Sequence, residues 1–167
     1  MNIQTAQTKV LDLLSEINRP GINSVIDFIK NSNYLTTAQC NSHHRRDHGL
    51  MLHSLEVLDT MLATDTHGYP RESMIIVALF HDLGKATING HRTGTGKHPS
   101  RSVAILKKCG FELTPPEYSA IYNHHPGKNP RKLLAAINNP LQMLLHKGDC
   151  TSTGIDKSGR TYKFSVL

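Results

Sequence analysis

The sequence predicts an all-α fold built as a single domain of 167 residues. Apolar residues recur at spacings of three and four along most of the chain, as at Val10, Leu14 and Ile17, which is the pattern of helices that bury one face. Alternating strand and helix units are not found, which argues against a parallel-sheet nucleotide-binding fold. A chain of this length buries a sizeable core without disulfides or other staples.

Helix boundaries follow from breakers and caps. Glycine–proline breakers lie at 18–21 and 68–70, and the glycine-rich stretch 84–97 has no apolar period and is expected to be a loop. Thr114, followed by two prolines, is a predicted N-cap. Helix 71–83 is the most apolar and is expected at the centre. The expected helices span 10–17, 22–29, 49–65, 71–83, 99–108, 115–124, 130–137 and 141–151.

The expected single domain covers residues 1–167, with its core at 43–152. The N-terminal helices fall within 1–42, with a polar loop over 31–46, and a turn is expected at 126–130. The tail, 153–167, is polar and then alternates in hydropathy, so we expect a strand or an extended arm.

Composition excludes several classes of protein. The longest apolar run has seven residues, at 74–80, which is too short to cross a bilayer, and the N-terminus lacks the pattern of a secretory signal. We therefore expect a cytoplasmic protein without a membrane partner. The three cysteines show no close pairing, which favours free thiols over a structural disulfide.

Charge and histidine are unevenly used. The chain carries a formal charge of +6, and nine basic against two acidic residues lie between positions 85 and 132. A positive field concentrated in one segment favours an anionic ligand, although a solvated basic face would look the same. The eleven histidines are an unusually high number, and metal sites are the usual reason for such a number.

Four ionisable side chains fall on apolar faces of the expected helices. His53 follows Leu50 by three residues, His81 and Asp82 continue the apolar stripe of helix 71–83, and Asp149 follows the apolar positions of the last helix. Burying an imidazole or a carboxylate without a partner is costly. A lone inward histidine is usually a hydrogen-bonded core residue, but four such groups together favour a shared metal ion.

Three stretches then resemble a known family. HSLEV at 53–57, FHDLGK at 80–85 and HKGDCTS at 146–152 are similar to the HD-domain metal-dependent phosphohydrolase superfamily. Its signature is a histidine, a later His-Asp pair and a distant aspartate on separate helices of a bundle. The resemblance covers about residues 43–152, and it implies that His53, His81, Asp82 and Asp149 hold a first divalent metal ion.

Two more stretches resemble the branches that bind more than one metal. HPSRS at 98–102 and NHHPG at 123–127 fall where HD-GYP cyclic-dinucleotide phosphodiesterases and certain exoribonuclease HD domains carry extra histidines. This resemblance implies a second metal held by His98 and His124, with His125 as an additional ligand and Asp82 as a bridge. HHRRDHGLMLH at 43–53 is also similar to the exoribonuclease and relaxase-associated branches. The Gly-Tyr-Pro at 68–70 precedes the His-Asp pair and is interpreted as a helix breaker only.

The same resemblance implies roles for the residues near the metals. Asp82 and Lys85 are the predicted catalytic residues, because two bridged cations activate water and Lys85 can bind phosphate or assist the leaving group. Two divalent ions are expected, and iron, manganese, nickel, cobalt, zinc and magnesium all stay open. The predicted substrate-binding residues are Lys85, Arg92, Lys97, Arg101, His44 and His48.

The predicted function is metal-dependent hydrolysis of a phosphomonoester or phosphodiester in a nucleotide or short nucleic acid. The alternative is a catalytically silent HD domain that serves regulation or interaction, although none of the expected ligands is missing from the sequence. A nucleic-acid-binding module is a third hypothesis, but the basic segment offers few aromatic residues for stacking. At 167 residues, the chain is too short for the nucleic-acid-binding domain of the exoribonucleases, so we do not expect processive RNA degradation.

Overall fold

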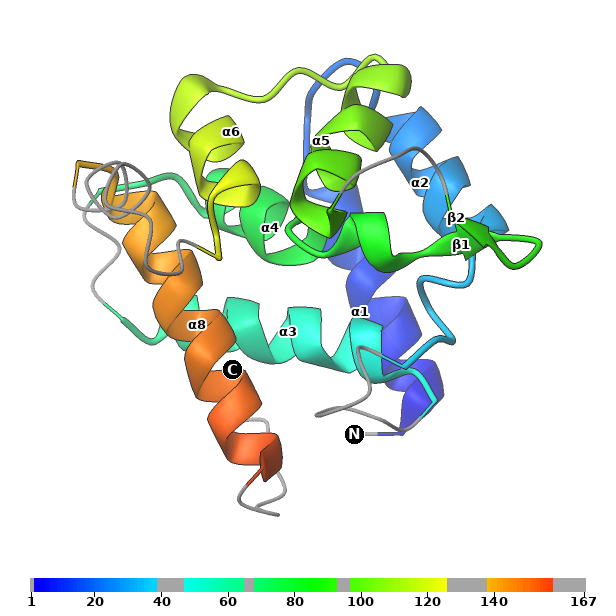
Figure 1. The fold of residues 1–167 in the computed structure, drawn as a ribbon, viewed down its shortest axis with the longest axis horizontal. Helices are drawn as coiled ribbons and strands as arrows, with labels where there is room; N and C mark the ends of the chain where they lie inside the picture. Colours follow the sequence, from blue (N-terminus) through cyan, green and yellow to red (C-terminus); the bar gives the residue numbers. More distant parts are fainter. Residues whose placement is uncertain (1, 39–46, 65–67, 93–96, 126–137, 158–167) are drawn as a thin grey trace.

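The structure, a computed structural model, describes residues 2–38, 47–64, 68–92, 97–125 and 138–157, including all their side chains except those of 155–157. The described part is a helical bundle with one short ribbon, which confirms the all-α fold class (Figure 1). In chain order the elements are α1 (Ile3–Ser15), α2 (Ile22–Asn31), α3 (Gly49–Leu62), α4 (Arg71–Phe80), the 3₁₀ turn η1 (Leu83–Lys85), β1 (Thr87–Ile88), β2 (His91–Arg92), α5 (His98–Lys108), α6 (Pro115–Tyr122) and α8 (Pro140–Lys157).

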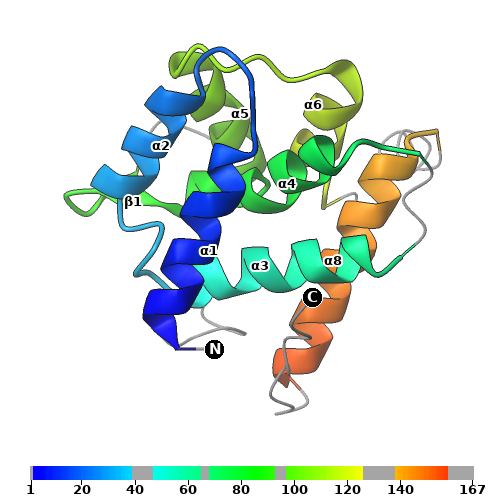
Figure 2. The same cartoon turned by 180° about the vertical axis from the view of Figure 1, so that it is seen from behind.

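Two helices form the centre of the bundle. α3 and α4 pack against each other, α1 crosses one end of α3, and α8 crosses the other (Figures 1 and 2). α5 and α6 lie on the far side of α4 from α3, and α6 reaches down to α8. Every residue of α4 from Ser73 to Phe80 is buried, as the predicted central position of this helix requires. α3 is at least as apolar as α4, and most of its residues are buried.

The central helix ends earlier than predicted. α4 stops at Phe80, His81 is its C-cap, and the chain then tightens into η1 instead of continuing to residue 83. The cause is a contact with α5, because the Gly84 N–H donates to the Ser102 hydroxyl at 2.8 Å and not to a carbonyl of its own helix. A side chain eighteen positions away therefore determines this helix end.

The sequence predicts a loop over 84–97, but part of this stretch forms regular structure. β1 and β2 form an antiparallel ribbon in which Thr87 pairs with Arg92 and Ile88 with His91. Asn89 and Gly90, which join the strands, both have positive φ, at 51° and 78°. Asn-Gly is the preferred pair for this two-residue turn, so the sequence did carry a signal for the hairpin.

The remaining boundaries are mixed. Thr114 is the N-cap of α6 and forms a capping box with Glu117, as the sequence predicted in part. α8 continues to Lys157, so the expected extended tail is wrong for its first residues. The predicted turn at 126–130, the helix at 130–137 and the tail beyond 157 lie outside the described residues. Among the described helices, none is both long enough and apolar enough to cross a membrane.

Candidate metal centre

Five segments of the bundle bring the predicted ligands together. His53 lies in the middle of α3, His81 and Asp82 follow α4, and His98 is the first residue of α5. His124 and His125 follow the end of α6, and Asp149 lies on the inner face of α8. All seven residues predicted as metal ligands therefore meet at one place, although the positions that carry them span almost a hundred residues of the chain.

A first cluster forms around His53. Its Nε2 lies 3.3 Å from His81 Nε2, 3.2 Å from Asp149 Oδ1 and 3.7 Å from Asp82 Oδ2. His81 Nε2 is also 3.3 Å from Asp82 Oδ2. All four side chains are buried. The atoms that point inward are imidazole nitrogens and carboxylate oxygens, which are the ligand atoms of divalent transition metals.

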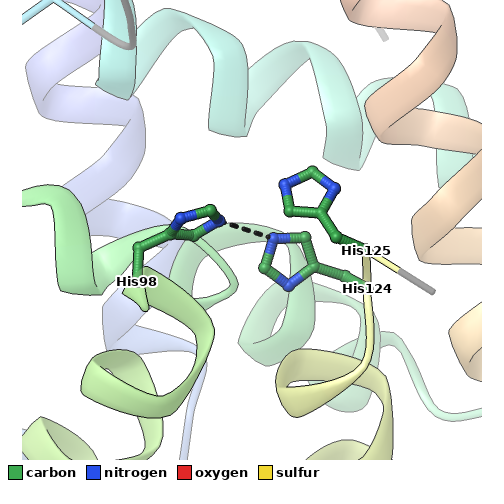
Figure 3. A group of neighbouring side chains, drawn as sticks. All are labelled: His98, His124 and His125. Carbon is green, nitrogen blue, oxygen red and sulfur yellow. Dashed lines mark hydrogen bonds between the residues drawn. The ribbon is translucent and has the colours of Figure 1, made fainter. Parts of the chain in front are cut away.

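A second cluster lies beside the first. His98 Nε2 and His124 Nε2 are 3.2 Å apart, and the ring of His125 packs against both (Figure 3). His98 comes from α5, whereas the other two come from the chain that leaves α6. The three residues each offer a ligand atom within 4.8 Å of the others. His125 is half exposed, so this cluster forms the outer side of the centre.

Asp82 lies between the two clusters. Its Oδ2 faces His53 and His81, while its Oδ1 lies 3.2 Å from His98 Nε2 and 3.6 Å from His124 Nε2. The carboxylate is 1% exposed. Asp82 therefore presents one carboxylate oxygen to each cluster.

Hydrogen bonds fix which ring nitrogen each histidine presents. His81 Nδ1 is 2.9 Å from the carbonyl of Ala78, and His124 Nδ1 is 2.7 Å from the carbonyl of Ile121. A carbonyl only accepts, so each Nδ1 carries a proton, and in the neutral form of the ring the Nε2 lone pair faces the centre. This is the arrangement that orients histidine ligands in metalloproteins. The donor set therefore fits a bound metal.

The protonation states suit the same role. Burial raises the pKa of Asp82, but its contacts with His81, Lys85 and His124 outweigh burial and hold the pKa well below its usual value. Burial lowers the pKa of His98 to about 3 despite the nearby Asp82 carboxylate, and burial together with His124 lowers that of His125 to about 4. At neutral pH the carboxylate is therefore anionic and both rings are neutral, which is the state that binds metal.

A comparison with protein-family models gives a match to the model described as HD domain over residues 50–154. This chain belongs to the HD domain family. The match spans α3 to α8 and so contains all seven predicted ligands. Comparisons with curated proteins and with solved structures gave no significant match.

In this HD domain Lys85 lies directly against the shared carboxylate. Its ammonium is 2.6 Å from Asp82 Oδ2, and its side chain is mostly buried. The predicted catalytic pair is thus in contact. A cation held at this position is a donor for an anionic oxygen that approaches the centre.

The other predicted substrate-binding residues differ in their surroundings. Arg92 on β2 and Lys97, just before His98, are exposed to solvent. Arg101 is buried, and its Nε donates to the carbonyl of Gly84 at 2.8 Å, so it supports the turn after the His-Asp pair. His48 Nδ1 lies 2.6 Å from the Leu35 carbonyl in front of α3. His44 lies outside the described residues.

Two residues near the HD centre were not predicted from the sequence. His53 Nδ1 lies 3.0 Å from the Ser152 hydroxyl, which in turn is 2.7 Å from Glu56 Oε2. Both partners are buried. Glu56 follows His53 by one turn of α3, and Ser152 follows Asp149 by one turn of α8. That shared spacing of three residues was the available signal, because residues three apart lie on the same face of a helix.

Proposed function

We propose that this HD domain is a phosphohydrolase that uses two divalent metal ions to cleave a phosphoester in a nucleotide or short nucleic acid. The observation that carries the proposal is the position of Asp82, with one carboxylate oxygen toward His53 and His81 and the other toward His98 and His124. Such a shared carboxylate is of use chiefly to a pair of cations, and paired cations serve in-line displacement at phosphorus.

Each cluster would hold one ion. His53, His81, Asp82 and Asp149 would hold the first, and Asp82, His98, His124 and His125 would hold the second. When bound, such ions lower the pKa of a water molecule and neutralise phosphate oxygens. Nitrogen-rich sites that include carboxylates suit iron, manganese, cobalt, nickel and zinc.

The protein's own residues define the direction of approach. The first cluster is buried, whereas His98 and His125 of the second are 23% and 51% exposed, so a substrate would reach the centre over the second cluster. Lys97, which directly precedes His98, is exposed. Lys85 would donate a hydrogen bond to a phosphate oxygen or to the leaving oxygen next to Asp82.

The positive charge of the 85–132 segment supports a substrate that carries several negative charges. Nucleotides, cyclic dinucleotides and short oligonucleotides all meet this description. A substrate screen would therefore include these three groups and p-nitrophenyl esters of phosphomono- and phosphodiester type, each with manganese, nickel, cobalt, zinc and magnesium.

Metal content gives the first test. Elemental analysis of the purified chain should find bound metal that Asp82→Ala removes, whereas Asp12→Ala, which removes an exposed carboxylate of α1, should leave the metal in place. Unchanged metal content in Asp82→Ala would contradict the assignment of the centre. Bound metal without hydrolysis of any member of the screen would instead favour a silent HD domain with a regulatory role.

A further inference from the structure

A polar pair on α3 meets a polar pair on α8 behind the first cluster. His53 and Glu56 are one turn apart on α3, and Asp149 and Ser152 are one turn apart on α8. Contacts alternate between the helices: Asp149 Oδ1 to His53 Nε2 at 3.2 Å, His53 Nδ1 to Ser152 Oγ at 3.0 Å, and Ser152 Oγ to Glu56 Oε2 at 2.7 Å. The four side chains form one continuous buried row.

The direction of the protons in this row follows from the donors available. A carboxylate only accepts, so the Ser152 hydroxyl donates its single proton to Glu56. The same oxygen can then only accept from His53, which places the His53 proton on Nδ1. His53 Nε2 is left with its lone pair, directed at Asp149 and at the ring of His81.

The position of the His53 proton decides which atom faces His81. The Nδ1 of His81 is already committed to the Ala78 carbonyl, so whenever both rings are neutral their Nε2 lone pairs face each other across 3.3 Å. Such an approach is repulsive unless a cation lies between the nitrogens. Fixing the proton of His53 on its outer nitrogen therefore prepares the inner one for a metal ion.

We infer that Glu56 and Ser152 are positioning residues, which hold His53 in the tautomer that binds the first metal ion. The inference rests on the proposed function in that it takes His53 as a ligand. His81 and His124 are held differently, since their acceptors are main-chain carbonyls three residues earlier in the chain. Those acceptors survive any side-chain substitution, whereas the support of His53 depends on side chains from two helices.

The packing of α8 on α3 supports the same inference. A Cβ atom at Gly148, one turn before Ser152, would lie 3.0 Å from the carbonyl oxygen of Val57 and 3.1 Å from its side chain. The two helices thus approach closely at this point, and this places the Ser152 hydroxyl within reach of the ring on α3. The first metal site would therefore be complete only when α8 is docked.

The test compares three variants with a matched control. Ser152→Ala removes the hydroxyl that joins His53 to Glu56. Glu56→Gln keeps the shape of the Glu56 side chain but removes its charge, and Ser152→Thr keeps a hydroxyl at position 152. The control is Ser54→Ala, which removes a buried hydroxyl beside His53 that donates to the Leu50 carbonyl at 3.0 Å. Circular dichroism would verify that each variant is folded.

The first measurement uses metal-free protein labelled with ¹⁵N at histidine, at alkaline pH, where imidazoles are neutral. We expect the His53 ring of the wild type and of Ser54→Ala to be protonated at Nδ1. In Ser152→Ala the Nδ1 of His53 has lost its acceptor, and in Glu56→Gln the Ser152 hydroxyl can turn. A fraction of His53 protonated at Nε2 should therefore appear in both variants. Ser152→Thr should return the wild-type pattern.

The second measurement is metal affinity, obtained by titration of Mn²⁺ against a chelating indicator. Loss of a partner that orients a histidine ligand typically lowers affinity about 10- to 100-fold, so we expect this for the first ion bound by Ser152→Ala. A wild-type tautomer and affinity in both Ser152→Ala and Glu56→Gln would overturn the inference, as would an equal loss of affinity in Ser54→Ala. Absence of hydrolytic activity with an intact tautomer effect would refute the proposed function alone.

Discussion

Gly84→Ala would place a methyl group inside the contact between η1 and α5. The added Cβ would lie 2.2 Å from the carbonyl oxygen of His98, 2.7 Å from the amide nitrogen of Ser102 and 2.8 Å from Arg101 Cβ. Two of these atoms belong to the backbone of α5, so no rotation of a side chain relieves the overlap. Gly84 does not use the left-handed conformation, so the cost arises from this contact and not from φ.

The expected loss of stability can be built from the contacts that must open. Overpacking a tight contact costs about 1–3 kcal/mol. Moving η1 from α5 also strains the bond from the Gly84 N–H to Ser102 and the bond from Arg101 Nε to the Gly84 carbonyl, each worth about 1 kcal/mol net. The free energy of unfolding should therefore fall by about 3–5 kcal/mol, which for a chain of this size lowers Tm by about 10 °C.

A glycine elsewhere in the chain supplies the control. Gly154 is exposed on α8, and a Cβ there would meet nothing within 4 Å. Because alanine is the better helix former, Gly154→Ala should raise stability by about 0.5–1 kcal/mol. Urea unfolding followed by circular dichroism would measure both variants. Wild-type stability in Gly84→Ala, or an equal change in the two, would refute the reasoning from close packing.

Three further predictions concern charge and metal. Removing metal with EDTA should lower Tm, because an ion at about a hundred times its Kd stabilises the folded state by about 2.7 kcal/mol; equal melting curves with and without EDTA would contradict a folded-state metal centre. Lys85→Met should raise Mn²⁺ affinity about five- to tenfold, because the Lys85 ammonium, 2.6 Å from Asp82, competes with the metal for that carboxylate. The same substitution should reduce the rate of hydrolysis. Calorimetry would measure the gain in affinity, and rate assays would measure the loss of activity. Arg19→Met should cost about 3 kcal/mol at neutral pH, because Arg19 donates at 2.7 and 2.9 Å to Glu117, whose side chain is fully buried. Burial raises the pKa of Glu117, but hydrogen bonds from Arg19, Ser73 and Thr114 outweigh burial and lower the pKa from its ordinary value of 4.5. The stabilisation from this ion pair is therefore present above pH 4.5 and is lost as the pH falls through the lower pKa of Glu117 in the folded state. Urea midpoints of wild type and variant should thus converge in acid; a constant difference would contradict the assignment.

Local patterns in the sequence were sufficient for the inner helices and for the inward positions of the four ionisable residues of the first cluster. The three histidines of the second cluster were expected only from the resemblance to a family. The apolar run of α4 and the spacing of His53 on α3 predicted burial, because helical periodicity places such residues on one face. The hairpin at Asn89-Gly90 was also locally encoded, although the stretch was expected to be loop. These features depend on residues close to one another in the chain.

Contacts between segments far apart in the chain could not be predicted from the sequence. The end of α4 is set by Ser102, and the orientation of His53 by Ser152, which lies 99 positions away. Glu56 shows the difficulty most directly, because an acidic residue within a helix usually faces solvent. In the structure Glu56 is buried, and the docking of α8 on α3 brings the Ser152 hydroxyl to its carboxylate.

The early end of α4 also explains how neighbouring residues serve one metal centre. In a continuous helix, successive side chains diverge by about 100°, so His81 and Asp82 would face different directions. In the structure His81 keeps helical angles while Asp82 adopts φ −106° and ψ 8°, and His81 Nε2 and Asp82 Oδ2 lie 3.3 Å apart. The break therefore brings ligand atoms of two adjacent residues to the same place, and Gly84 permits the close contact with α5 that accompanies the break. Gly84→Ala should accordingly weaken metal binding even in the fraction that remains folded. Titration with Mn²⁺ well below the Tm of the variant would reveal this loss. Wild-type affinity under those conditions would contradict the idea that this turn sets the geometry of the two ligands.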